Sequence, residues 1–130
     1  MRAVAQTEYG AFAVDLETEE VDTAGASDVR ASEPMRLSLP RVVASAASGS
    51  TIVAVVDRKP PLVVSHDAGI TWRETRGGLP PGNAVAIAED DPDLIVYASR
   101  NRLHVSTDGG TFWRALAVEL PEIEALSLEA

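Results

Sequence analysis

Hydrophobic residues in this chain occur in short runs that predict β-strands. Runs rich in valine, isoleucine and alanine recur at regular intervals, at 51–56, 62–65, 84–88, 94–98 and 103–106. Glycine, proline and aspartate cluster between them, as at 77–82 and 90–93, and such clusters are typical of turns. No segment places apolar residues at helical spacing. The pattern therefore predicts an all-β protein of short strands joined by tight turns.

The pattern is repeated along the chain with a period of about 41 residues. The octapeptide at 65–72, SHDAGITW, returns at 106–113 as STDGGTFW, and the pair Leu79-Pro80 returns at 120–121 after the same interval. An earlier Leu-Pro pair at 39–40 lies 40 residues before Leu79-Pro80. The octapeptide and the two Leu-Pro intervals thus give nearly the same period. A fixed period of this length is typical of propellers and solenoids, in which each repeat is one supersecondary unit.

The repeated octapeptide resembles the Asp box, or BNR repeat, whose pattern is Ser-x-Asp-x-Gly-x-Thr-Trp. The fixed positions of the two copies are occupied by Ser65, Asp67, Gly69, Thr71, Trp72, Ser106, Asp108, Gly110 and Trp113, with Phe112 in place of the second threonine. Over roughly residues 40–130, the chain is similar to Asp-box β-propellers of sialidases, sortilin-type receptors and photosystem-assembly-factor-like proteins. The resemblance implies a structural box, because in those families the box lies away from the catalytic or binding face.

Elementary chemistry also gives the box a structural role. Its aspartate can accept backbone N–H groups across a tight turn, and its serine hydroxyl can close a second local bond. Its glycine can adopt a positive φ angle without steric cost. The tryptophan can then fill the gap between neighbouring sheets, where it buries a large apolar area. Phe112 removes one hydroxyl but should keep the turn.

Four-stranded blades fit the period, so the predicted fold is an all-β propeller with about three blades in one domain, 1–130. The second and third blades, 41–80 and 81–121, have strands A to D at 42–46, 51–57, 62–66 and 71–75, and at 85–89, 94–99, 103–107 and 112–117. The first blade, 1–40, has strands B to D at 2–7, 11–16 and 21–24, with its box eroded to Asp15-Leu16-Glu17. It lacks an inner strand, which the segment 123–130 can supply. Residues 25–39 are about ten residues longer than the corresponding segment of the other repeats, and a loop or an extension of strand D would account for them.

Three blades are too few to close a ring, so the flanks of the two end blades should be exposed. The chain begins at a B strand and ends at an A strand. The final strand, around Leu126 and Leu128, therefore fits beside Val4 of a first blade. Because these ends should lie on opposite sides of an open half-ring, we expect the pairing to join two chains. The predicted assembly is a homodimer with a six-bladed ring closed by exchange of C-terminal strands.

Composition narrows the range of functions. The 130 residues suffice for one domain with a modest core. Twenty acidic residues against eleven basic ones give a net charge of −9, which disfavours nucleic acid and anionic membranes as partners. The N-terminal residues lack the apolar core of a signal peptide, and no apolar run elsewhere could span a bilayer, so we expect a cytoplasmic protein. Without cysteine there is no disulfide framework or thiolate metal site.

The sequence contains no recognisable catalytic constellation. Sialidase chemistry requires an arginine cluster, a tyrosine nucleophile with a carboxylate partner, and an acid. The chain has two tyrosines, Tyr9 and Tyr97, and lacks the Arg-Ile-Pro-type signature of that family. His66 and His104 favour exposed or hydrogen-bonded roles over catalysis. The acidic turn at 89–93 could hold calcium, but such turns are more often metal-free. We expect no enzyme activity and no cofactor or resident metal.

Charge divides between the two predicted faces of the propeller. The B–C and D–A loops share one face, which carries Arg41, Arg58, Lys59, Arg76, Arg100 and Arg102. This basic face could bind an anionic ligand or an acidic protein segment, and accidental segregation of surface charge explains it equally well. The interpretation is a non-enzymatic binding or assembly scaffold. The alternative is a carbohydrate-binding, lectin-like module or a sialidase-related glycosidase. Both tryptophans are committed to the boxes, which leaves few aromatic rings for sugar stacking and disfavours the lectin.

Overall fold

The computed structural model describes residues 1–23, 42–57, 60–75 and 79–129. Its strands are β1 (Arg2–Thr7), β2 (Gly10–Asp15), β3 (Val21–Thr23), β4 (Val42–Ser48), β5 (Thr51–Val56), β6 (Leu62–Ser65), β7 (Arg73–Glu74), β8 (Gly82–Ala88), β9 (Asp91–Ser99), β10 (Arg102–Ser106), β11 (Arg114–Glu119) and β12 (Ile123–Glu129). Residues 25–39 and the Leu-Pro pair at 39–40 lie outside the described residues.

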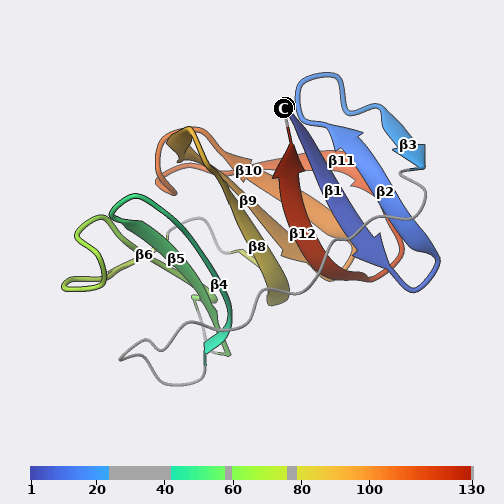
Figure 1. Ribbon diagram of the computed structural model, residues 1–130. Helices are drawn as coiled ribbons and strands as arrows, with labels where there is room; N and C mark the ends of the chain where they lie inside the picture. Colours follow the sequence, from blue (N-terminus) through green and yellow to red (C-terminus); the bar gives the residue numbers. More distant parts are fainter. Residues whose placement is uncertain (24–41, 58–59, 76–78, 130) are drawn as a thin grey trace.

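These strands pair into three antiparallel four-stranded sheets (Figure 1). The first sheet has the order β12-β1-β2-β3, the second β4-β5-β6-β7, and the third β8-β9-β10-β11. Each predicted strand is present, and each period of the repeat forms one sheet. The outer strands β7 and β11 begin two residues later than predicted, because the tryptophan of each box still belongs to the turn. Its indole N–H donates to the carbonyl of the box glycine, Gly69 or Gly110.

The C-terminal strand completes the first sheet, as the sequence predicted. β12 pairs with β1 from Arg2 opposite Glu129 to Thr7 opposite Ile123, and an ion pair of 2.6 Å joins Arg2 to Glu129. The expectation that this pairing needs a second chain is wrong, since the structure forms it within one chain. The reason is the arrangement of the sheets: the first sheet lies directly beside the third, so β12 reaches it soon after β11 ends.

The sheets are arranged in the spatial order first, third, second. β12 packs against β8, and β8 packs against β4, so the inner strands of successive sheets are neighbours. In Figure 1 these three strands follow one another across the molecule. This arrangement is consistent with blades of a propeller placed side by side around one axis.

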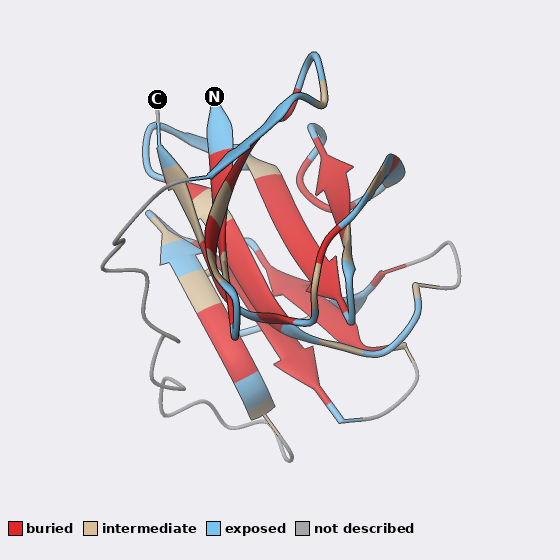
Figure 2. Cartoon of the chain, turned by 90° about the vertical axis from the view of Figure 1, so that its right-hand side faces the viewer, coloured by how far each residue is buried: buried red, intermediate tan, exposed pale blue. Residues whose placement is uncertain are grey.

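Apolar side chains fill the two spaces between neighbouring sheets. Val14, Val96 and Leu103 belong to the cluster between the first and third sheets. Val53 and Ile95 belong to the cluster between the second and third. Both clusters draw on alternate residues of each strand, because successive side chains point to opposite faces of a sheet. Figure 2 shows the buried residues along the strands and the exposed ones mainly in the connecting turns.

The two outward faces of this row are also buried within a single chain. On the first sheet, Val4 and Ala13 are each 3% exposed. On the second sheet, Ala54 is 0% and Val63 1% exposed. The expectation that these flanks are left open to water is therefore not met at these positions. Their burial removes one of the two arguments for a second copy, and the small number of sheets remains as the other.

Candidate functional site

The first Asp-box turn is held together by its own side chains. The carboxylate of Asp67 accepts hydrogen bonds from the hydroxyls of Ser65 at 2.7 Å and Thr71 at 2.5 Å, and from the backbone N–H of Thr71 at 2.9 Å. The Ser65 hydroxyl accepts from the N–H of Gly69, whose φ is 92°. These donors, the Thr71 hydroxyl first, lower the pKa of Asp67 to about 2. The turn therefore keeps its carboxylate charged and occupied.

The second turn repeats this network without one hydroxyl. Asp108 accepts from the hydroxyl of Ser106 at 2.8 Å and from the backbone N–H groups of Thr111 and Phe112 at 3.1 and 3.0 Å. The N–H of Gly110 donates to Ser106. The backbone of Phe112 is the largest cause of the lowered pKa of Asp108. Phe112 thus replaces the threonine without opening the turn, since the backbone donor is kept.

The two tryptophans differ in what they pack against. Trp113 packs against the cluster between the second and third sheets and so occupies a gap between neighbours, as expected. Trp72 instead packs against Ala54, Val56 and Val63 of its own sheet. The second sheet stands at the end of the row, so no described sheet faces Trp72 from the other side. The expectation of an inter-sheet role holds where a neighbouring sheet exists.

In the first sheet, a shorter turn takes the place of a box. Asp15 accepts hydrogen bonds from the backbone N–H groups of Glu17 at 2.8 Å and Thr18 at 3.0 Å, and these bonds, with Thr18 first, lower the pKa of its carboxyl. An aspartate therefore still closes the turn, although the serine and tryptophan of the pattern are missing from this segment.

Two of the six residues predicted to form the basic face, Arg100 and Arg102, lie in the described part of the chain. Arg41, Arg58, Lys59 and Arg76 lie outside the described residues. Arg100 is exposed, and the guanidinium of Arg102 donates to the carboxylate of Glu119 at 3.0 Å. Arg102 is thus already neutralised by a residue of the neighbouring strand, which makes it a weaker anion-binding candidate than the sequence suggested.

The tyrosine and histidine in the interior take part in a hydrogen-bonded core. Tyr97 is 0% exposed, and its hydroxyl donates to the carbonyl of Pro80 at 2.8 Å. Nε2 of His104 lies 3.0 Å from the Ser99 hydroxyl, and the two rings lie 5.9 Å apart. Burial raises the pKa of Tyr97, and burial followed by the charge of Arg102 lowers the pKa of His104.

The structure also places the other candidate groups of the sequence, which are His66 and the acidic turn at 89–93. His66 is exposed, with Nδ1 3.4 Å from the Thr51 hydroxyl. In the acidic turn, Asp91 opens β9 and accepts from the N–H of Asp93 at 3.1 Å. Within residues 1–23, 42–57, 60–75 and 79–129, no three histidine, aspartate or glutamate side chains gather in a way that could hold a metal ion. The described part of the chain also has no helix long and apolar enough to cross a membrane.

A cleft of about 750 Å³ opens between the second and third sheets. It is lined by Val64, His66, Arg73, Glu74, Thr75, Leu79, Pro80, His104, Gly109, Gly110, Thr111, Phe112, Trp113 and Ala115. The lining thus combines β6 and β7 of one sheet with β10, β11 and the second Asp-box turn of the other. Its volume falls within the range of about 300–1,000 Å³ that is usual for ligand sites. This is the best-formed candidate site in the described residues.

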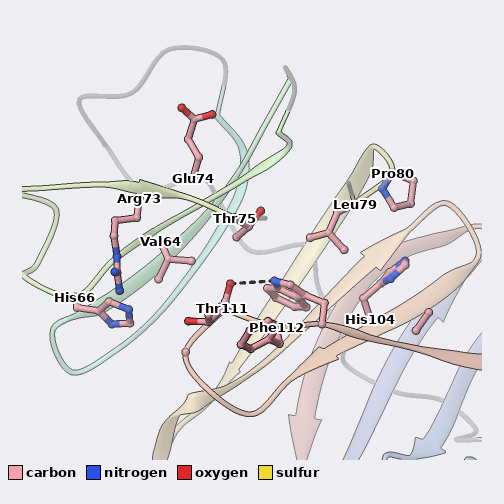
Figure 3. A pocket seen from close by; sticks show the side chains of 14 residues that line it. Val64, His66, Arg73, Glu74, Thr75, Leu79, Pro80, His104, Thr111 and Phe112 are labelled. Atoms are coloured by element: carbon pink, nitrogen blue, oxygen red, sulfur yellow. Dashed lines mark hydrogen bonds between the residues drawn. The ribbon is translucent and has the colours of Figure 1, made fainter. Parts of the chain in front are cut away.

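Among the described residues of this lining, Arg73 is the one arginine. It is exposed, and its guanidinium has no hydrogen-bond or ion-pair partner among the residues that the structure describes. Figure 3 shows its side chain extending toward His66, while the carboxylate of Glu74 points away from Thr111 and Phe112. Sequence reasoning missed Arg73, although a signal was present: an arginine follows the box tryptophan in both copies, at 73 and 114.

The comparisons with known proteins concern the fold. No protein-family model matches the chain, and no curated protein matches it either. Among solved structures, the chain is similar to the crystal structure of a GH74 enzyme from Niastella koreensis, with 20% identity and a TM-score of 0.51. The match covers 92% of this chain and 18% of that chain. This likeness supports a propeller-like arrangement of the three sheets and extends no further than the fold.

Proposed function

We propose that the chain is a non-enzymatic β-propeller module that binds a ligand between its second and third blades. The observation that carries the proposal is the cleft of about 750 Å³, with an arginine at its wall whose side chain no described residue binds. Ligand sites combine an apolar lining with a few polar groups that fix orientation. Here Val64, Leu79 and Trp113 supply the apolar part, and Arg73 supplies the charge. An anionic ligand or an acidic protein segment suits this lining.

The basic face of the sequence analysis contributes less to this proposal than the cleft does. Arg102 is paired with Glu119, whereas the guanidinium of Arg73 is free among the described residues and lies at a cleft, a shape that focuses the field of its charges. The negative charge of the ligand would pair with this arginine. Because the chain as a whole has a net charge of −9, this site must act locally, at short range.

The test is a titration of the ¹⁵N-labelled protein with three probes: a hexaglutamate peptide, a sulfated oligosaccharide and a neutral oligosaccharide. The indole N–H signal of Trp113, which lines the cleft, reports binding, and that of Trp72 is the matched control outside it. We expect an anionic probe to move the Trp113 signal and to leave the Trp72 signal in place. If no probe moves it, the proposal fails. Release of reducing ends from an oligosaccharide would contradict the non-enzymatic part.

Carbohydrate binding is a second candidate, favoured by the aromatic residues at the cleft. Phe112 is 77% exposed there, beside the partly buried Trp113. An exposed ring can stack on a sugar face, and the neutral oligosaccharide distinguishes this case. A shift of the Trp113 signal with that probe alone would favour a lectin-like module over an anion-binding one.

We also propose that two copies form one ring of six blades. Three sheets with adjacent inner strands cover a part of a propeller's circumference, and closed rings of four to eight blades are usual. The contact would join the first sheet of one copy to the second sheet of the other. Sedimentation equilibrium tests this assembly: twice the chain mass of 13.7 kDa is expected, and a stable monomer at all concentrations contradicts it.

A further inference from the structure

The counterpart of Arg73 in the next interface already binds a carboxylate. Arg114 stands 41 residues after Arg73 and, like it, opens the outer strand of its sheet. Its Nη2 donates to the backbone carbonyl of Leu16 at 2.9 Å, and its Nη1 lies 3.9 Å from the carboxylate of Glu19. Both acceptors belong to the turn between β2 and β3 of the first sheet. One arginine thus makes a hydrogen bond to a backbone carbonyl and a longer ion pair with a side-chain carboxylate of the same short segment.

Glu19 makes a second contact that fixes this segment on β11. Its carboxylate accepts the backbone N–H of Ala117 at 2.6 Å. Glu19 has a φ of 61°, in the left-handed region that residues other than glycine rarely adopt. The backbone of this turn therefore accepts an unfavourable conformation at the residue whose carboxylate meets both Arg114 and β11. An acidic loop closes the space between the third and first sheets.

At the corresponding place between the second and third sheets, the described residues include no such loop. There the turn of the following sheet is the second Asp box, and its carboxylate, Asp108, is occupied by donors of its own turn. Gly110 brings that turn close to the second sheet, since an added Cβ would lie 3.0 Å from Val64. Nothing in the described part of the chain reaches Arg73 as Glu19 reaches Arg114. The cleft is the result.

We infer that the cleft binds an acidic peptide segment of a partner protein, with a glutamate or aspartate carboxylate on Arg73. The inference rests on the proposed function and names its ligand class and its main residue. Arg114 supplies the template, because its guanidinium donates to a backbone carbonyl and forms an ion pair with a carboxylate of the same segment of this chain. The guanidinium fork suits such paired acceptors better than an ammonium group does.

The other charged or titratable groups of the lining are few. His66 lies in the direction in which Arg73 extends, His104 is buried and hydrogen-bonded to Ser99, and Glu74 points away (Figure 3). A peptide carboxylate on Arg73 therefore meets no carboxylate turned toward it in the lining shown. Phe112, at the rim, adds apolar surface for the peptide side chains.

The experiment uses the chain's own acidic loop as the probe. A fluorescein-labelled peptide with the sequence of residues 14–21, VDLETEEV, is titrated with the full-length protein by fluorescence anisotropy. The variant is Arg73→Gln, and the matched control is Arg2→Gln, another exposed arginine, which lies outside both the cleft lining and the predicted basic face. A neutral peptide with Asp15→Asn, Glu17→Gln, Glu19→Gln and Glu20→Gln measures the contribution of charge. Circular dichroism checks that both variants are folded.

We expect Arg73→Gln to weaken binding of the acidic peptide at least about tenfold, the order of a charged hydrogen-bonded pair. Arg2→Gln should bind like the parent, and the neutral peptide should bind weakly to all three proteins. Parental affinity in a folded Arg73→Gln variant would overturn the inference. If the peptide does not bind but an oligosaccharide moves the Trp113 signal, the inference fails while the proposed function stands. If neither binds, both fail.

Discussion

The two Asp-box turns have nearly the same internal hydrogen bonds and very different surroundings. In both, a serine hydroxyl donates to the aspartate and accepts from the glycine N–H, and the indole N–H returns to the glycine carbonyl. The first turn, at the end of the row of sheets, leaves Ile70 82% exposed. The second packs against the neighbouring sheet, where Gly109 and Gly110 are buried.

This difference shows that the local structure of a turn and its contribution to stability have separate causes. Hydrogen bonds within eight residues depend on those residues alone, so the repeated motif gives the same turn twice. The area buried by each tryptophan depends on whether another sheet lies opposite. The motif therefore predicts the turn, while its position in the row of sheets decides how much the turn contributes to stability.

The largest effect should come from truncating the two tryptophans. Trp113→Ala should cost about 3–5 kcal/mol, because a ring packed between two sheets is lost and a cavity remains. Trp72→Ala should cost about 1–2 kcal/mol, because its ring contacts one sheet. Urea denaturation of both variants measures the difference. Both costs are for the single chain and are measured at low protein concentration, where equal costs would contradict the comparison. A cost at Trp72 that rises with protein concentration would report the contact proposed above between two copies.

The box glycines should show a smaller difference in the same direction. Both have positive φ angles, 92° at Gly69 and 95° at Gly110, so alanine at either position should cost about 1–2 kcal/mol. At Gly110 an added Cβ also meets Val64 at 3.0 Å, while at Gly69 the nearest atom, in Trp72, is 3.6 Å away. Gly110→Ala should therefore be the less stable variant by thermal denaturation. The reverse order would contradict the tighter packing of the second turn.

A buried histidine, His104, lies two residues before the second Asp box and should make the stability of the fold depend on pH. Burial lowers the pKa of His104 in the folded state, so the unfolded chain binds the proton first as the pH falls below about 6.5. The contribution of neutral His104 is complete above that pH and is lost as the pH falls toward its folded-state pKa. His104→Gln should flatten this part of the stability profile. A profile that keeps its full slope in His104→Gln would contradict this prediction.

The smallest effect should appear at strongly acidic pH and distinguish the two aspartates. The folded pKa of Asp67 is about 2, below the value of about 3.9 for an unfolded chain. Its contribution is therefore present above about pH 4 and lost as the pH falls toward 2. Asp67→Asn should remove more of this dependence than Asp108→Asn, because Asp108 lacks the threonine hydroxyl. Urea midpoints between pH 2 and 5 measure both, and a larger effect at Asp108 would contradict this ranking.

Much of the fold follows from the sequence because its signals are local. The 41-residue period, the alternating apolar residues and the box residues each concern a few neighbouring positions, and they predicted the strands of all three sheets. The vacancy in the first sheet and the strand that fills it also followed, since the N-terminal repeat begins one strand late. Ser65, Asp67 and Gly69 form the first turn through contacts that span no more than five residues.

Other properties were decided by contacts between distant residues, which no local pattern encodes. The pairing of β12 with β1 within one chain depends on the first sheet lying beside the third. The two interfaces also differ: Glu19 closes one from 98 residues away along the chain, while no described residue binds the guanidinium of Arg73 in the other, where the cleft lies. Sequence determined that arginine follows each box tryptophan. Tertiary structure decided which arginine meets a carboxylate, because that depends on the turn that the next sheet brings toward it.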